Sequence, residues 1–262
     1  MMKLIASDLD GTLLQPHSKE VPDRLFPYIK KYSERGGLFV AASGRQYANL
    51  RRLFAPVKDD IAYICENGCL VIYQDTILYH AHMLRSTGEE ILRGIQSQKD
   101  CEILLSGVDT CYIQPQNPSF ETYIKEHVKN NTTVVDDIFS VKEPYFKISV
   151  YNPNGIEHSE KFFYDTFQDQ VNVVTSGNAW LDMMPKGIHK GSALAVLSES
   201  LNIPFKDMMA IGDHYNDLEM LQIVGYPTCV SNAQPGIKDI CNFEAVNAAD
   251  YMIEKMEEAI SQ

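Results

Sequence analysis

Two carboxylates separated by one residue follow directly after an apolar segment near the start of the chain. Residues 4–6 are Leu-Ile-Ala, and Asp8 and Asp10 come next, before Gly11 and Thr12. Two acids held this close repel each other and resist transfer out of water. A bound cation, or a reaction that uses the carboxylates, would explain their presence. A turn with helix-capping acids is the structural alternative.

Alternating strand and helix patterns surround these acids. Mostly apolar runs predict buried strands at residues 3–7, 38–42, 62–65, 208–211 and 227–230. Helical spacing of apolar residues predicts helices at residues 21–35, 46–54, 191–201, 217–224 and 251–260. A hairpin is expected at residues 69–83, with Gln74 and Asp75 at its turn. The pattern is typical of a doubly wound, Rossmann-like α/β core with a mainly parallel sheet.

The middle of the chain has a different pattern. Helices are predicted at residues 86–98, 118–129 and 156–167, and strands at 102–105, 111–114, 145–151, 171–175 and 180–184. Paired strands between helices are typical of an antiparallel α+β unit. We therefore predict an α/β core formed by residues 1–83 and 186–262, with an α+β domain of residues 84–185 inserted into it.

Polar clusters follow four of the predicted core strands. Because ligands bind beyond the carboxyl ends of strands in such sheets, the clusters are expected to meet at one edge. Taken singly, Ser43-Gly44-Arg45 and Glu66-Asn67-Gly68 are also ordinary turn signals. They are Asp8 with Asp10, Ser43-Gly44-Arg45, Glu66-Asn67-Gly68 and Gly212-Asp213.

This set of side chains suits phosphoryl transfer. Asp8 could attack phosphorus, and a divalent cation held by Asp8 and Asp213 would shield the repulsion between carboxylate and phosphate. Hard oxygen ligands favour Mg²⁺. Asp10 could protonate the leaving alcohol and then deprotonate the water that hydrolyses the aspartyl-phosphate.

Three further residues could bind the phosphate. Gly11 permits a sharp turn that brings backbone N–H groups close to phosphate oxygens. The Ser43 hydroxyl could bind another oxygen, and Lys190 could place a cation beside Asp8. Lys190 taken alone could equally face water, and Asp217 could simply cap a helix.

Composition narrows the class of protein. The 262 residues include 23 basic and 35 acidic side chains, giving a net charge of −12 that disfavours nucleic acid and anionic lipid as partners. The six cysteines include no CxxC pair, so a structural zinc site is not expected. No apolar run approaches the ~18 residues of a membrane span, and no signal peptide is evident, so we expect a soluble, cytoplasmic protein. The composition does not specify an oligomeric state.

The polar clusters resemble the four motifs of the haloacid-dehalogenase-like (HAD) superfamily. In chain order, the motifs are Asp8-Leu9-Asp10-Gly11-Thr12, Ser43-Gly44-Arg45, Lys190-Gly191 and Gly212-Asp213-His214-Tyr215-Asn216-Asp217. The large insert after the second motif, and Glu66-Asn67-Gly68 before it, resemble the Cof-like phosphatase subfamily. The chain departs from the usual pattern at Cys69 and at residues 247–253, but none of the four motifs is broken.

The resemblance implies roles for individual residues. Asp8 would be the nucleophile and Asp10 the general acid and base. Asp8, the Asp10 carbonyl and Asp213 would hold Mg²⁺, and Asp217 would support the metal site. The residues implied in binding substrate phosphate are Leu9, Gly11, Ser43, Gly44, Arg45, Lys190 and Asn216. The insert resembles a cap, with candidate recognition loops around Asp109-Thr110, Gln116-Asn117 and Ser176-Gly177-Asn178.

These observations predict a Mg²⁺-dependent phosphatase that acts on a small phosphorylated metabolite, a sugar phosphate or a phosphorylated cofactor. A phosphomutase on the same core is one alternative. A non-catalytic regulatory module that binds metal or phosphate is another, although such a module has no need of the Asp10 acid. A phospho-accepting receiver domain is disfavoured because it would need neither the insert nor two acids one residue apart.

Overall fold

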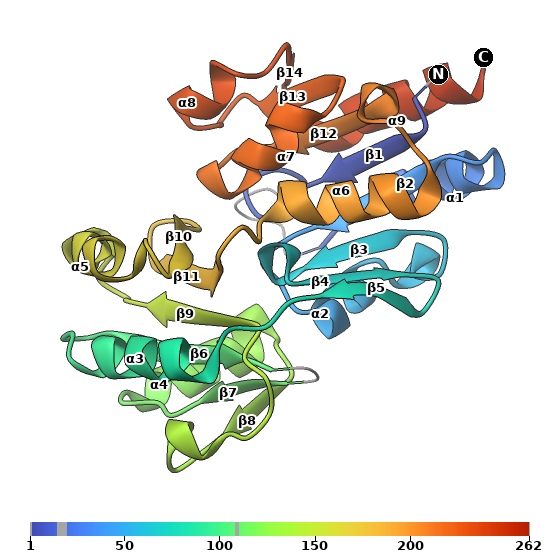
Figure 1. The fold of residues 1–262 in the computed structure, drawn as a ribbon. Helices are drawn as coiled ribbons and strands as arrows, with labels where there is room; N and C mark the ends of the chain where they lie inside the picture. Colours follow the sequence, from blue (N-terminus) through green and yellow to red (C-terminus); the bar gives the residue numbers. More distant parts are fainter. Residues whose placement is uncertain (1, 15–19, 108–109, 262) are drawn as a thin grey trace. The chain divides into compact units, whose positions relative to one another are not determined.

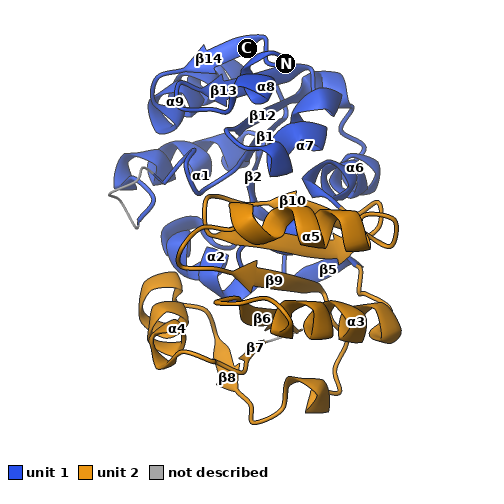
Figure 2. Ribbon diagram, turned by 90° about the vertical axis from the view of Figure 1, so that its left-hand side faces the viewer, with its two compact units in different colours: residues 1–80, 189–262 blue, residues 81–188 orange. Residues whose placement is uncertain are grey.

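The computed structural model describes residues 2–14, 20–107 and 110–261, and they form two compact units (Figure 1; Figure 2). Unit 1 combines the two ends of the chain, residues 1–80 and 189–262, and unit 2 comprises residues 81–188. The chain therefore leaves the first unit once and returns to it once. The inserted domain expected from the sequence, residues 84–185, is three residues shorter at each end than unit 2.

Unit 1 is built on an eight-stranded sheet in the part of the chain that the structure describes, in the order β14-β13-β12-β1-β2-β3-β4-β5. Its parallel strands are β1 (Leu4–Ser7), β2 (Leu38–Ala42), β3 (Ala62–Cys65), β12 (Met208–Gly212), β13 (Tyr226–Val230) and β14 (Phe243–Ala245). The hairpin β4 (Leu70–Tyr73) and β5 (Thr76–His80) completes one edge in antiparallel pairing. The predicted α/β class with a mainly parallel sheet is confirmed.

Helices cover both faces of this sheet, which is why its central strands are buried along their whole length (Figure 1). On one face α6 (Lys190–Leu201) packs against α7 (Leu218–Ile223), and on the other α1 (Phe26–Glu34) packs against α9 (Ala248–Ile260). Helix α2 (Tyr47–Leu53) contacts β3, and the short α8 (Pro235–Lys238) precedes β14.

Local sequence explains several element boundaries. Gly36, with φ of 81°, ends α1, and Gln74 and Asp75 take the two left-handed positions of the hairpin turn. The helix predicted from residue 21 begins instead with a 3-10 turn, Asp23–Leu25, before α1, whose second residue is Pro27. The sequence prediction missed α8 and β14, because segments of four and three residues carry too little periodicity to detect.

Unit 2 contains a six-stranded sheet within the described residues, in the order β10-β11-β9-β6-β7-β8. Its pairs are antiparallel except for the parallel pair of β7 and β8. The strands are β6 (Glu102–Ser106), β7 (Cys111–Ile113), β8 (Thr132–Val134), β9 (Lys147–Tyr151), β10 (Val171–Thr175) and β11 (Trp180–Pro185). The short strand β8 was not predicted.

Helices also cover unit 2. Side chains of α3 (Arg85–Gln96) and α5 (Glu157–Phe167) share one apolar cluster with β6, β9 and β11. The helix expected over residues 118–129 is split into α4 (Pro118–Thr122) and one turn of π-helix, Tyr123–Val128, which ends at Lys129 with φ of 60°. No helix in the described parts of the chain is long and apolar enough to cross a bilayer.

Candidate active site

The four polar clusters lie at the carboxyl ends of β12, β1, β2 and β3, which are consecutive neighbours in the sheet of unit 1. Strand register aligns Ser7 with Ile211 on one side and with Ala41 on the other. The backbone of Asp8 continues this pairing by donating to the Ile211 carbonyl at 2.9 Å. Segments about two hundred residues apart in the chain therefore meet at one edge.

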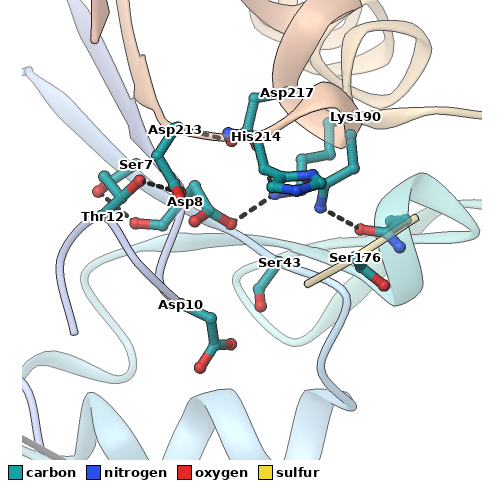
Figure 3. Close-up of polar contacts among 12 residues, drawn as sticks. Ser7, Asp8, Asp10, Thr12, Ser43, Ser176, Lys190, Asp213, His214 and Asp217 are labelled. Carbon is teal, nitrogen blue, oxygen red and sulfur yellow. Dashed lines mark hydrogen bonds and ion pairs between the residues drawn. The ribbon is translucent and has the colours of Figure 1, made fainter. Parts of the chain in front are cut away.

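Lys190, the first residue of α6, is the centre of charge pairing in the site (Figure 3). Its side chain is fully buried, and its Nζ lies 2.5 Å from Asp8 Oδ1 and 2.6 Å from Asp217 Oδ1. A buried ammonium is tolerated only where carboxylates and hydrogen bonds replace water. The alternative in which Lys190 merely faces solvent is therefore excluded.

Asp213 completes a trio of carboxylates at this position. Oxygen atoms of Asp8, Asp213 and Asp217 all lie within 4.8 Å of one another. Thr12 donates its hydroxyl to Asp213 Oδ1 at 2.7 Å. Asp217 Oδ2 accepts the backbone N–H groups of Asp213 and His214, at 3.0 and 3.2 Å. Asp217 thus orders the Asp213 loop while its other oxygen holds Lys190.

The electrostatics of the trio favour a divalent cation. Burial raises the pKa of Asp8 well above its ordinary range, and Asp217 and Asp213 raise it further, against the opposing effect of Lys190. Burial and the Asp217 charge raise the pKa of Asp213 to about 6. Burial disfavours the charged form of Lys190, but Asp217 and Asp8 outweigh this and raise its pKa. In their ionised forms, three carboxylates beside one ammonium carry two negative charges that a divalent cation would balance, and hard oxygen donors suit Mg²⁺.

Asp10 lies apart from the buried trio (Figure 3). Its side chain is 57 % exposed and forms a two-pronged ion pair with Arg45, with Nε–Oδ2 at 2.7 Å and Nη2–Oδ1 at 2.5 Å. Arg45 also donates to Asn49 Oδ1 at 3.3 Å. In this arrangement the guanidinium predicted to bind phosphate is directed at the Asp10 carboxylate, where it fixes the orientation of that group.

Close backbone approach explains why Gly11 follows Asp10. Its φ is 90°, and a Cβ at this position would lie 2.5 Å from Asp213 Oδ2. The turn is closed by the Leu14 N–H, which donates to the carbonyl of the buried Leu9 at 2.7 Å. Asn232 Nδ2 donates to the Gly11 carbonyl at 2.8 Å and so links the turn to the loop after β13.

The remaining predicted phosphate-binding residues lie in two loops. Ser43 is buried after β2, and its hydroxyl accepts the Arg45 N–H at 3.3 Å. Gly44 packs against the amide of Asn67, and Asn216 Nδ2 donates to Asn67 Oδ1 at 3.2 Å. The sequence prediction assigned no site role to Asn67 or Asn232. Asn67 belongs to the Glu-Asn-Gly turn, but the only local signal there is that of a turn.

The proposed recognition loops of unit 2 have defined local structure. Asn117 caps α4 through its side chain, which accepts the Ser119 N–H, and the backbones of Gln116 and Asn117 donate to the Glu102 carboxylate. These residues line a cavity of about 830 Å³ together with Tyr123 and other side chains. Asp109 lies outside the described residues. The cysteines are free thiols, including the buried Cys69, and Asn247 caps α9.

Comparisons with known proteins place the chain in one family. The model of the haloacid dehalogenase-like hydrolase family matches residues 5–255. The 5-amino-6-(5-phospho-D-ribitylamino)uracil phosphatase YbjI of Escherichia coli K12 is 24% identical, covering 93% of this chain and 90% of its own. An HMP-PP phosphatase of Escherichia coli O6:H1 is also 24% identical, covering 91% and 87%. A crystal structure of a Streptococcus mutans UA159 protein superposes with a TM-score of 0.88 at 26% identity, covering 100% of both chains.

The fold is that of a HAD-type hydrolase, and the chain belongs to the haloacid dehalogenase-like hydrolase family. It is a phosphoric monoester hydrolase of the Cof-like type.

Proposed function

We propose that this protein is a Mg²⁺-dependent phosphatase that hydrolyses a small phosphorylated metabolite through an aspartyl-phosphate on Asp8. The observation that carries the proposal is the 2.5 Å contact between Lys190 Nζ and Asp8 Oδ1, inside a cluster that also contains Asp213. A carboxylate that attacks a phosphate dianion needs positive charge around it, and this cluster supplies one cation and the ligands for another. A sugar phosphate or a phosphorylated cofactor is the substrate class, in keeping with the two named relatives, which are phosphatases.

In the proposed reaction, Asp8 attacks phosphorus and the bond to the leaving alcohol breaks. Asp10 donates a proton to the departing oxygen. The ion pair with Arg45 orients the ionised form of Asp10, which is the form left after the proton has been given up. In the second half, Asp10 removes a proton from water, which attacks phosphorus and releases inorganic phosphate and Asp8. Lys190 stays charged throughout because the buried Asp217 carboxylate remains its partner while Asp8 carries the phosphoryl group.

Backbone and side-chain donors would bind the phosphoryl oxygens. The Ser43 hydroxyl and the N–H groups of Leu9, Asp10 and Gly44 lie at the same sheet edge as Asp8. The Gly11 N–H instead donates to the Leu14 carbonyl at 3.2 Å, so Gly11 contributes the turn and not a donor. Asp8, the Asp10 carbonyl and Asp213 would hold Mg²⁺, which when bound offsets negative charge on the phosphate and the carboxylates. Asp217 supports this set by ordering the Asp213 loop.

Removal of Mg²⁺ is expected to abolish activity and to destabilise the fold. Phosphate release from a panel of phosphorylated metabolites should fall to background in excess chelator and return when Mg²⁺ is restored. The thermal midpoint should rise by several degrees when Mg²⁺ is added, because the ion binds the ionised carboxylates of the folded state alone. In Asp213→Asn this rise should be lost. Full activity in chelator would contradict the requirement for Mg²⁺. A Mg²⁺-dependent rise in the midpoint of Asp213→Asn equal to that of the wild type would contradict Asp213 as a ligand.

Substrate selectivity is expected to reside in unit 2, because the groups described in unit 1 serve only the phosphate and the cation that all substrates share. Asn117→Ser keeps the cap on α4, and Asn178 is exposed in the turn between β10 and β11. Each of Asn117→Ser and Asn178→Ala should change kcat/KM ratios between substrates by about 3- to 10-fold, the worth of one hydrogen bond. As a further test, both loops can be exchanged with those of a relative. If the kcat/KM ratios across the same panel then remain unchanged, selectivity resides in unit 1.

A further inference from the structure

Two consecutive residues in the loop after β3 have left-handed backbone conformations although neither is glycine. Glu66 has φ of 51° and Asn67 has φ of 55°, and both side chains are buried. Such conformations are strained in residues other than glycine and persist only where surrounding contacts impose them. Asparagine tolerates the left-handed region better than most residues, which makes position 67 suited to this turn.

The contacts that impose this turn come from the loop after β2. The Glu66 N–H donates to the Arg45 carbonyl at 3.1 Å, and the Asn67 N–H donates to the Ser43 carbonyl at 3.0 Å. Gly44 lies so close that a Cβ on it would be 3.2 Å from the Asn67 amide. The turn therefore fixes the path of the loop that carries Ser43.

The Asn67 side chain also reaches a loop from a distant part of the sheet. Its Oδ1 accepts from Asn216 Nδ2 at 3.2 Å. Asn67 follows β3 and Asn216 follows β12, and two strands, β1 and β2, lie between them in the sheet. The amide bridge thus links two loops whose strands are separated in the sheet by β1, which precedes Asp8, and β2. The next residue, Gly68, packs against the His189 carbonyl, immediately before Lys190.

We propose that Asn67 is a positioning residue for phosphate binding, which holds the Ser43–Gly44 loop and Asn216 at a fixed separation. The inference rests on the proposed function, because it assumes that Ser43, Gly44 and Asn216 contact substrate phosphate. Its contribution is pre-organisation: the donors are held in place before phosphate binds, so binding loses less conformational entropy. Asn67 therefore acts on the phosphate part of every substrate alike.

Inhibition by inorganic phosphate tests this role without any leaving group. Asn67→Gly removes the amide bridge while glycine readily keeps φ near 55°. The inhibition constant for phosphate, and KM for every phosphomonoester, should rise together by about 3- to 10-fold. Asn202→Gly is the matched control, because Asn202 is also an asparagine with a left-handed conformation (φ of 52°) but lies at the C-terminal cap of α6. Its phosphate inhibition constant should equal that of the wild type.

Asn216→Ala tests the same bridge from its other end, and its thermal midpoint shows whether the variant remains folded. The double variant Asn67→Gly/Asn216→Ala should weaken phosphate binding by clearly less than the product of the single effects, because both remove one shared bond. The inference would be overturned if Asn67→Gly had the phosphate inhibition constant of the wild type. It would also be overturned if the effect of the double variant on phosphate binding equalled the product of the two single effects. A wild-type protein that neither releases phosphate from the panel nor binds phosphate would instead refute the proposed function itself.

Discussion

Asp8→Asn should reduce turnover at least about 10⁴-fold while leaving the protein folded. The amide has almost the shape of the carboxylate and can still accept a hydrogen bond from Lys190, but it cannot form the acyl-phosphate bond to phosphorus. Phosphate release measured under saturating substrate and Mg²⁺ checks the loss, and urea unfolding checks the fold.

A conservative control separates the chemistry from the loss of one charge. Asp165→Asn also removes a carboxylate, but at an exposed ion pair with Lys161 on α5. Exposed pairs of this kind contribute little to stability, so this variant should keep both its turnover and its unfolding midpoint. Turnover by Asp8→Asn within tenfold of the wild type would rule out Asp8 as the nucleophile.

Lys190→Met should affect both activity and stability. The methionine fills a similar volume but removes the only ammonium that the described residues place against Asp8 and Asp217. Leaving buried charges without a partner costs about 3–5 kcal/mol. Repulsion between the carboxylates would raise the pKa of Asp8 further, which leaves less of the ionised nucleophile.

The expected result for Lys190→Met is a fall in kcat/KM of about 100-fold or more for every substrate, with a lower urea midpoint. The loss should be uniform across the panel because the partners of Lys190 are Asp8 and Asp217, which serve the phosphate and the cation that all substrates share. Lys161→Met, which breaks an exposed pair, is the matched control and should behave like the wild type. A loss confined to one substrate would show that Lys190 recognises a leaving group instead.

The sequence was sufficient to predict the class of fold. Continuous apolar runs such as residues 38–42 and 62–65 indicate strands covered on both faces, and glycine or turn residues mark where neighbouring elements end. These patterns are local, so they can be recognised in the sequence without knowledge of tertiary contacts. Short elements such as β8 and β14 were missed because pairing with a neighbouring strand, not residue pattern, stabilises three residues as a strand.

The sequence by itself also indicated which residues could do chemistry. Asp8, Asp10 and Asp213 were candidates from their type, spacing and position after predicted strands, and Lys190 was a weaker candidate at the start of a predicted helix. Only the tertiary structure decided which of them pair. Asp8 and Lys190 are 182 residues apart, and Asn67 and Asn216 are 149 apart. Their contacts depend on the order β12-β1-β2-β3, which the packing of the whole sheet sets. Burial raised the pKa values of Asp8 and Asp213 in the same way, because the loss of water around a carboxylate is a property of all its neighbours and not of its own segment.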